Sequence, residues 1–183
     1  MLNSTNKVDD LHEFKPFLLN QKRIMGLDMG KKRIGVSIST HSLDGALPLR
    51  TISEDKFSNI IDILKSIISE YNIMGIIFGL PKNMDGTEGR SAQSVKDKAE
   101  KMCSEINIKY AFWDERLSTV AVDRSYEKNE KSRSKKKQAK KDIDNLAAAF
   151  ILEGAINYIM KSCLLYTSPS PRDLSTSRMP SSA

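Results

Sequence analysis

Lys22-Arg-Ile-Met-Gly-Leu-Asp28-Met-Gly-Lys-Lys-Arg-Ile-Gly-Val-Ser-Ile-Ser39 is the stretch of sequence that decides the fold of this chain. Residues 22–28 and 33–39 are rich in apolar and β-branched side chains, which favours two strands. Residues 29–32 contain a glycine and two lysines and predict a turn. We therefore expect a β-hairpin at the start of the domain.

The pattern continues outward from this hairpin as an alternation of helices and strands. Apolar residues at spacings of three and four predict an amphipathic helix over 56–71, and the nearly all-apolar segment 74–78 predicts a strand buried on both faces. Together the elements predict an α/β fold, a five-stranded mixed sheet flanked by helices. The other expected elements are a strand at 47–52, a helix at 89–106, a buried strand at 108–113, a helix at 117–128, and, after a basic stretch, a last helix at 142–160.

The two ends of the chain differ in composition from the middle. Residues 1–21 are polar with one short apolar patch, and we expect an N-terminal extension with one helical turn docked on the domain. Residues 22–162 form the expected domain. Residues 163–183 are rich in serine and proline, which predicts a disordered tail, and their resemblance to read-through sequence indicates that the tail is non-native.

The composition narrows the class of protein. The chain has 183 residues and a formal net charge of +6, which favours an anionic partner such as nucleic acid. Its two cysteines have no partners at metal-ligand spacing, so neither a zinc site nor a disulfide framework is expected. The longest apolar stretches are too short to span a membrane, and acids stand where a secretory signal carries basic residues. We expect a cytoplasmic protein without a membrane partner.

Three groups of acids follow or flank the expected core elements. Asp28 ends the first strand. It is either an acid that binds a cation or an aspartate that forms a turn with nearby backbone N–H groups. Asp114 and Glu115 follow the strand at 108–113. They are either functional acids or the acidic first turn of a helix, paired to Arg116. At 100° per residue, Asp144 falls on the apolar face of the last helix. The alternative is that Asp144 stands so close to the start of the helix that its side chain does not take part in that face.

The neighbouring Asp142 serves as a comparison, because it falls on the polar face of the same helix with Glu153. A site rich in carboxylate oxygens suits Mg²⁺ or Mn²⁺, and two such ions can activate a water for phosphodiester hydrolysis. The two histidines, His12 and His41, have no catalytic partner evident in the sequence, and we expect both at the surface.

Basic residues surround these acids. The glycine-containing loop 79–91 can bring backbone N–H groups to a phosphate, although glycines alone indicate only a tight loop. The lysine-rich run 128–141 is either a solvated linker or a phosphate-binding segment. The residues expected to contact nucleic acid are Lys31, Lys32, Arg33, Lys82, Arg90, Arg116, Lys135, Lys136, Lys137, Lys140 and Lys141.

Four segments in order resemble the motifs of one known family: Gly26-Leu-Asp-Met-Gly-Lys-Lys-Arg-Ile-Gly-Val36, Gly79-Leu-Pro-Lys-Asn-Met-Asp-Gly-Thr-Glu-Gly89, Trp113-Asp-Glu-Arg-Leu-Ser-Thr119, and Ile143-Asp-Asn-Leu-Ala-Ala-Ala149 with Ile151-Leu-Glu153. They are similar to the YqgF/RuvX family of pre-16S rRNA nucleases, also called Holliday junction resolvases, whose fold is RNase H-like. Where this chain has Ser39-Thr40, members of the family commonly have Ser-Asp, so no acid is expected to act there.

The resemblance implies a set of site residues and a function. It implies catalytic acids at Asp28, Asp114, Glu115 and Asp144, and metal ligands at Asp28, at Asp144 and within the Asp-Glu pair, where the longer arm favours Glu115. It implies a nuclease that trims the 5′ side of precursor 16S rRNA, with structured RNA favoured over branched DNA as substrate. The alternatives are a Holliday junction resolvase, a catalytically silent nucleic-acid-binding module and, less favoured for so short a chain, an ATPase of actin-like architecture.

Overall fold

The computed structural model describes residues 6–42, 45–82, 85–114 and 133–161, and within the last range the side chains of 145–160. The expected helix at 117–128 and the tail at 163–183 lie outside these residues. In the part of the chain that is described, no helix is long and apolar enough to cross a membrane.

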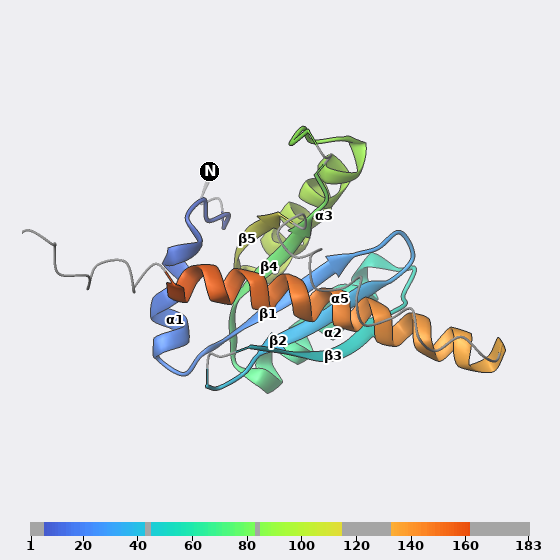
Figure 1. Ribbon diagram of the computed structural model, residues 1–183, viewed down its shortest axis with the longest axis horizontal. Helices are drawn as coiled ribbons and strands as arrows, with labels where there is room; N and C mark the ends of the chain where they lie inside the picture. The colour runs from blue at the N-terminus through green and yellow to red at the C-terminus, as the bar shows by residue number, and fades with distance from the viewer. Residues whose placement is uncertain (1–5, 43–44, 83–84, 115–132, 162–183) are drawn as a thin grey trace, which may run out of the picture.

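A five-stranded mixed sheet forms the middle layer, in the order β3-β2-β1-β4-β5 (Figure 1). The strands β1 (Arg23–Met29), β2 (Ile34–Ser39) and β3 (Ala46–Ile52) form an antiparallel meander. The strands β4 (Ile73–Leu80) and β5 (Lys109–Asp114) continue the sheet in parallel with β1. The expected fold class, an α/β RNase H-like mixed sheet flanked by helices, is confirmed.

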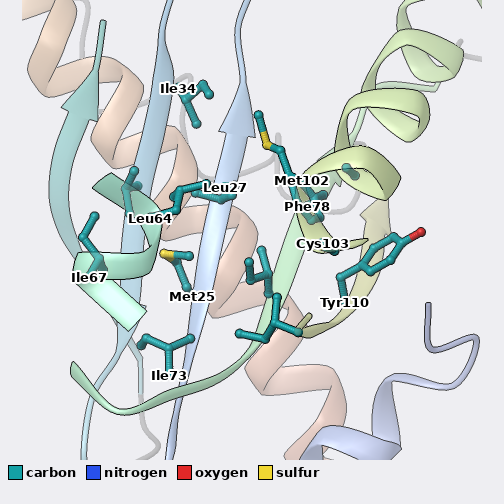
Figure 2. Close-up of a cluster of buried hydrophobic side chains, with 14 of the residues drawn as sticks. Met25, Leu27, Ile34, Leu64, Ile67, Ile73, Phe78, Met102, Cys103 and Tyr110 are labelled. Atoms are coloured by element: carbon teal, nitrogen blue, oxygen red, sulfur yellow. The ribbon is translucent and has the colours of Figure 1, made fainter. Parts of the chain in front are cut away.

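Two helices cover one face of the sheet. They are α2 (Phe57–Tyr71) and α3 (Arg90–Ile106), which pack the larger hydrophobic cluster against β1, β2 and β4 (Figure 2). Each helix ends at an asparagine in the left-handed conformation, Asn72 with φ 55° and Asn107 with φ 59°, whose N–H bonds back to the last turn. Asparagine tolerates this conformation and stops the helix directly before a parallel strand.

The opposite face is covered by α5 (Arg133–Lys161), which crosses the strands diagonally (Figure 1). Its residues Ile151, Leu152, Ala155, Ile156 and Ile159 form a second buried cluster with the sheet. The helix begins at Arg133 rather than at 142, so residues 133–141 of the basic run are helical and not a linker. Lysine, arginine, glutamine and alanine are good helix formers, and these residues include neither proline nor glycine. Figure 1 shows the basic end of α5 projecting beyond the sheet.

The N-terminal segment packs on the domain and forms one bridge with the outer edge of the sheet. A short 3-10 helix, η1 (Leu11–Phe14), leads into α1 (Lys15–Leu19), and Phe14 and Leu18 are buried. The ring of Phe14 lies directly over Gly75, where a Cβ would come within 2.1 Å of it. Just before η1, Val8 N–H donates to the Tyr110 carbonyl at 2.7 Å, which places this segment along the outer edge of β5.

The central strands are as buried as their composition indicates. Every residue of β2 is buried, and in β4 the residues Ile76, Ile77 and Phe78 are fully enclosed. Met74 departs from the expectation that 74–78 is buried on both faces, because it is 40% exposed near the start of β4.

Candidate active site

Asp28 lies near the end of β1, on the sheet face that α5 covers. Met25 and Leu27 pack into the cluster under α2 and α3, whereas Ile24 packs into the cluster under α5. Because side chains alternate along a strand, Gly26 and Asp28 share the α5 face with Ile24. The Asp28 side chain is half-buried. The backbone carbonyl of Asp28 accepts a hydrogen bond from the N–H of Gly30 at 3.2 Å, where the hairpin turn begins.

A close approach at Gly26 fixes α5 against the same face. A Cβ on Gly26 would come within 2.5 Å of Ser37 Oγ, 2.7 Å of Leu152 Cβ and 2.9 Å of the Ala148 carbonyl oxygen. The Ser37 hydroxyl donates to that carbonyl at 2.8 Å. The absence of a side chain at Gly26 therefore lets the helix backbone lie almost on the strand.

The turn of α5 that precedes Ala148 lies over the residues of β2 and β3 that are in register with Asp28. In the register of the sheet Asp28 pairs with Gly35, and Gly35 pairs with Thr51. The Thr51 hydroxyl donates to Asn145 Oδ1 at 2.8 Å, so this turn of α5 sits over that row.

Asp144 precedes Asn145 in the chain, and it precedes Ala148 by one helical turn. The residues expected to share its face, Ala148, Ile151 and Ala155, are all buried against the sheet. The side chains of Asp144 and Asp142 lie outside those described.

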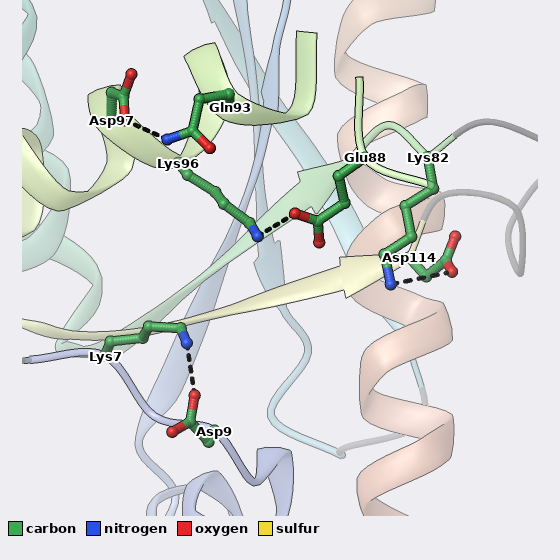
Figure 3. Close-up of polar contacts among 8 residues, drawn as sticks. All are labelled: Lys7, Asp9, Lys82, Glu88, Gln93, Lys96, Asp97 and Asp114. Carbon is green, nitrogen blue, oxygen red and sulfur yellow. Dashed lines mark hydrogen bonds and ion pairs between the residues drawn. The ribbon is translucent and has the colours of Figure 1, made fainter. Parts of the chain in front are cut away.

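Asp114 occupies the other side of the sheet. Trp113 packs into the cluster under α5, and Phe112 packs against the cluster under α2 and α3. Alternation then places Asp114 on the face of Phe112, opposite to that of Asp28. Its carboxylate lies 3.7 Å from the Lys82 ammonium, which follows β4 (Figure 3). The next residue, Glu115, and Arg116 lie outside the described residues.

The described side chains contain no group of three histidines, cysteines or acids that could hold a metal ion. That search does not include Glu115 or Asp144, the two acids expected beside Asp28. The structure thus brings Asp28 and the backbone of α5 together and separates Asp114 from them by the thickness of the sheet.

Basic residues surround the strand end that carries Asp28. Lys31 and Lys32 are exposed in the hairpin turn, and Arg33 is half-buried next to them. The turn is tight, because a Cβ on Gly30 would lie 2.6 Å from the Arg33 carbonyl oxygen. The lysines therefore stand at the same end of the sheet as the candidate acid.

Residues 85–89, which lead into α3, are held by polar side-chain contacts. Asp85 Oδ1 accepts from the Thr87 N–H at 2.9 Å and from the Thr87 hydroxyl at 2.6 Å. Glu88 pairs with Lys96, which keeps the pKa of the Glu88 carboxyl below its usual value (Figure 3). Gly89 caps α3 without a side-chain bond, the first turn holds no acid, and Arg90 is exposed at its start.

Sequence reasoning missed a group of residues at the outer edge of β5. A pocket there is lined by Asp9 and Asp10 of the N-terminal segment and by Trp113 and Tyr158, among others. His12, expected at the surface, is half-buried and stacks on Tyr158 with ring centroids 5.1 Å apart. No local signal could have found this pocket, because its walls come from segments that are far apart in the sequence. The other histidine, His41, is exposed as expected.

Comparison with known proteins identifies relatives along most of the chain. A family model described as "RuvX: Holliday junction resolvase" matches residues 22–158. A protein of Pelagibacter ubique named "Putative pre-16S rRNA nuclease" is 46% identical over 149 residues, which cover 81% of this chain and 97% of that one. A protein of the same name from Roseobacter denitrificans is 38% identical over 154 residues, which cover 83% of this chain and 93% of that one.

Solved structures with a similar arrangement of elements are more distant in sequence. RuvC of T. thermophilus in complex with Holliday junction substrate matches with a TM-score of 0.47 at 8% identity, over 78% of this chain and 96% of that one. The yeast mitochondrial Holliday junction resolvase Ydc2 matches with a TM-score of 0.46 at 14% identity, over 84% and 87% of the two chains.

Proposed function

Since the chain belongs to the RuvX family, we propose that it is a cytoplasmic, Mg²⁺- or Mn²⁺-dependent nuclease that processes the 5′ end of precursor 16S rRNA. Phosphodiester hydrolysis is the chemistry common to the family description and to the names of the relatives. The relatives' names favour structured RNA as substrate, and the family description makes branched DNA the second candidate.

One observation carries the proposal: α5 packs against β1 at Gly26, with no room for a Cβ between them. This contact supports an acid pair formed by Asp28 at the strand end and Asp144 one helical turn before Ala148. Two carboxylates from a strand and a helix supply the hard oxygen ligands that Mg²⁺ and Mn²⁺ prefer. The donor set therefore fits the metal that the family resemblance implies.

The third ligand in this proposal is Glu115. Successive side chains of a strand face opposite sides, and Asp114 lies on the face away from Asp28. A residue one position further along an extended chain returns to the face of Trp113 and Asp28, which favours Glu115 over Asp114. Asp114 then acts outside the metal site, beside Lys82.

A bound metal pair would supply an activated water and stabilise the leaving oxygen of the phosphodiester. The chain's own residues position the substrate. Lys31, Lys32 and Arg33 stand next to Asp28 and can neutralise phosphates on either side of the cleaved bond. The helical segment 133–141 projects beyond the sheet, and its basic sequence can hold the backbone of a longer nucleic acid there.

The test uses purified full-length protein with labelled precursor 16S rRNA and, separately, a four-way DNA junction, each with Mg²⁺ or with EDTA. We expect Mg²⁺-dependent cleavage of the rRNA precursor and weaker or no cleavage of the junction. Asp28→Asn and Asp144→Asn should abolish cleavage without unfolding the protein, because the amide keeps the size of the carboxylate and removes its charge.

Asp142→Asn is the matched control, since it makes the same change two residues away on the same helix. Its activity should equal that of the unchanged protein. Equal losses in Asp142→Asn and Asp144→Asn would contradict the assignment of Asp144, and cleavage of the junction alone would replace RNA by branched DNA. Absence of cleavage of both substrates in Mg²⁺ and in Mn²⁺ would favour a silent nucleic-acid-binding module.

A further inference from the structure

A pocket of about 340 Å³ opens at the outer edge of β5, two strands away from the strand that carries Asp28. Four parts of the chain form it: the N-terminal segment, the residues after β4, the end of β5 and the last turns of α5. The residues that matter for its chemistry are Asp10, Lys82, Phe112, Trp113, Asp114 and Tyr158.

Aromatic rings form the apolar wall of the pocket. The rings of Trp113 and Tyr158 have centroids 5.7 Å apart at an interplanar angle of 55°. The Trp113 indole packs closely against Gly154 of α5, where a Cβ would lie 2.9 Å from Nε1. Tyr158 is nevertheless 49% exposed, which is unusual for a large side chain packed among aromatic rings. His12 already stacks on Tyr158 with ring centroids 5.1 Å apart, so a flat, polarisable ligand such as a nucleobase would stack on the ring surface that stays exposed.

Charged groups form the rest of the pocket. The carboxylates of Asp10 and Asp114 accept hydrogen bonds only, and the Lys82 ammonium donates only. Three carboxylates line the pocket, those of Asp9, Asp10 and Asp114, and they disfavour a phosphate there because like charges repel. The edge of a nucleobase instead offers amino or imino hydrogens to the carboxylates and carbonyl or ring-nitrogen acceptors to the lysine.

The position of the pocket relates it to the candidate acids. Asp114 ends β5 and Lys82 follows β4, at the same end of the sheet as Asp28 on β1, because the three strands are parallel. Two strand spacings separate β5 from β1, about 10 Å. Trp113 faces the same side of the sheet as Asp28, so a nucleotide near the cleaved phosphate can reach this wall of the pocket while the phosphate lies at Asp28.

We propose that this pocket binds an unpaired base of the nucleic-acid substrate close to the cleavage position. The inference rests on the proposed nuclease function for its substrate, but the binding itself needs no catalysis. It assigns a role to the N-terminal segment, which supplies Asp10 to the wall. It also restricts the substrate to strands in which a nucleotide is unpaired beside the cleaved bond.

Trp113 makes binding directly measurable, because it is the chain's single tryptophan. The full-length protein is titrated in EDTA, so that nothing is cleaved, with a short single-stranded RNA of mixed sequence. The comparison ligands are the same RNA in a blunt duplex and a strand of equal length with abasic positions. We expect the single strand to change the Trp113 fluorescence and to bind more tightly than either comparison ligand.

Two variants test the pocket. Tyr158→Leu should weaken binding of the single strand about tenfold, the loss expected for one stacked base, and Tyr158→Phe should bind like the unchanged protein because the ring remains. Thermal melts of both variants check that this exposed position leaves the fold intact. Equal affinity for the abasic strand, or unchanged affinity in Tyr158→Leu, would overturn the inference.

These outcomes are separate from those of the cleavage assay. An enzyme that cuts rRNA but binds abasic and intact strands equally has no base pocket, and the proposed function stands. A protein that binds the base through this pocket but cuts neither substrate keeps the pocket and loses the nuclease assignment.

Discussion

Replacing Gly26 with alanine is the most informative single change in this protein. The added Cβ would meet Ser37 Oγ at 2.5 Å, Leu152 Cβ at 2.7 Å and the Ala148 carbonyl oxygen at 2.9 Å. Non-bonded heavy atoms prefer about 3.5–4.0 Å, so α5 must move away from β1 by roughly 1 Å. The displaced carbonyl belongs to a helix backbone and cannot yield by changing a rotamer.

The cost follows from the three close approaches together. Overpacking in a core costs typically about 1–3 kcal/mol, and three simultaneous clashes place Gly26→Ala near the upper end, about 3 kcal/mol. For a domain of this size 1 kcal/mol lowers the melting temperature by about 2–4 °C, so a drop of roughly 6–12 °C is expected. If Asp144 acts with Asp28, a shift of about 1 Å should also lower cleavage on the order of 100-fold in protein that is still folded.

Differential scanning calorimetry and the rRNA cleavage assay at 25 °C measure the two effects. Gly45→Ala is the control, because nothing lies within 4 Å of a Cβ at Gly45. It should melt and cut like the unchanged protein. A Gly26→Ala variant that melts within about 2 °C of Gly45→Ala would refute the close packing of α5 on β1. A variant with the expected melting drop and full activity would refute the link between this packing and the site.

Three further predictions concern the core, the basic helix and a buried thiol. Phe14→Ala should lower the free energy of unfolding by about 3–5 kcal/mol in urea titrations, because it leaves a cavity at a fully buried position. Leu19→Ala, at a 59% exposed position, should change the free energy of unfolding little. Equal effects of the two variants would contradict the packing of the N-terminal segment on the domain. Replacing Lys135, Lys136 and Lys137 with glutamine should flatten the slope of log affinity against log salt concentration, for RNA and DNA alike. The change should be about 0.7–0.9 for each phosphate that these lysines neutralise. An unchanged slope would show that they bind no phosphate. Burial raises the pKa of the Cys103 thiol above that of the unfolded chain, so stability should fall as pH rises through about 8.5, where the unfolded thiol ionises. Melting temperatures between pH 7 and 10 measure this fall, and a fall of the same size in Cys103→Ala would assign it to other groups.

The sheet was predictable because its signals are local. The hairpin at 22–39 combines two apolar runs with a turn, and both strands lie within one or two residues of their expected bounds. The buried strand at β5 was found by its largely apolar composition, but the apolar run 110–113 does not reveal which side chain faces which layer. The opposite orientations of Asp28 and Asp114 therefore had to come from the structure.

The N-terminal start of α5 was missed for a related reason. Amphipathic periodicity locates a helix only where the helix packs on something, and residues 133–141 carry almost no apolar side chain. Helix propensity alone favours a helix there, but it is a weak predictor beside a charge pattern typical of linkers. The helix-face argument for Asp144 needed only the packed part, and the burial of Ala148, Ile151 and Ala155 agrees with it.

The pairing of the N-terminal segment with β5 occupies backbone groups at one edge of the sheet. A strand at the edge of a sheet exposes N–H and C=O groups that can pair with the edge of another molecule. On the β5 side, Tyr110 donates to the Asn6 carbonyl and accepts from Val8, so these groups are already bonded. On the β3 side, Pro48 has no N–H to donate and interrupts the ladder that a second copy would need. A chain shortened to begin at Lys22 should therefore lose solubility in concentrated solution, even where its sheet still folds.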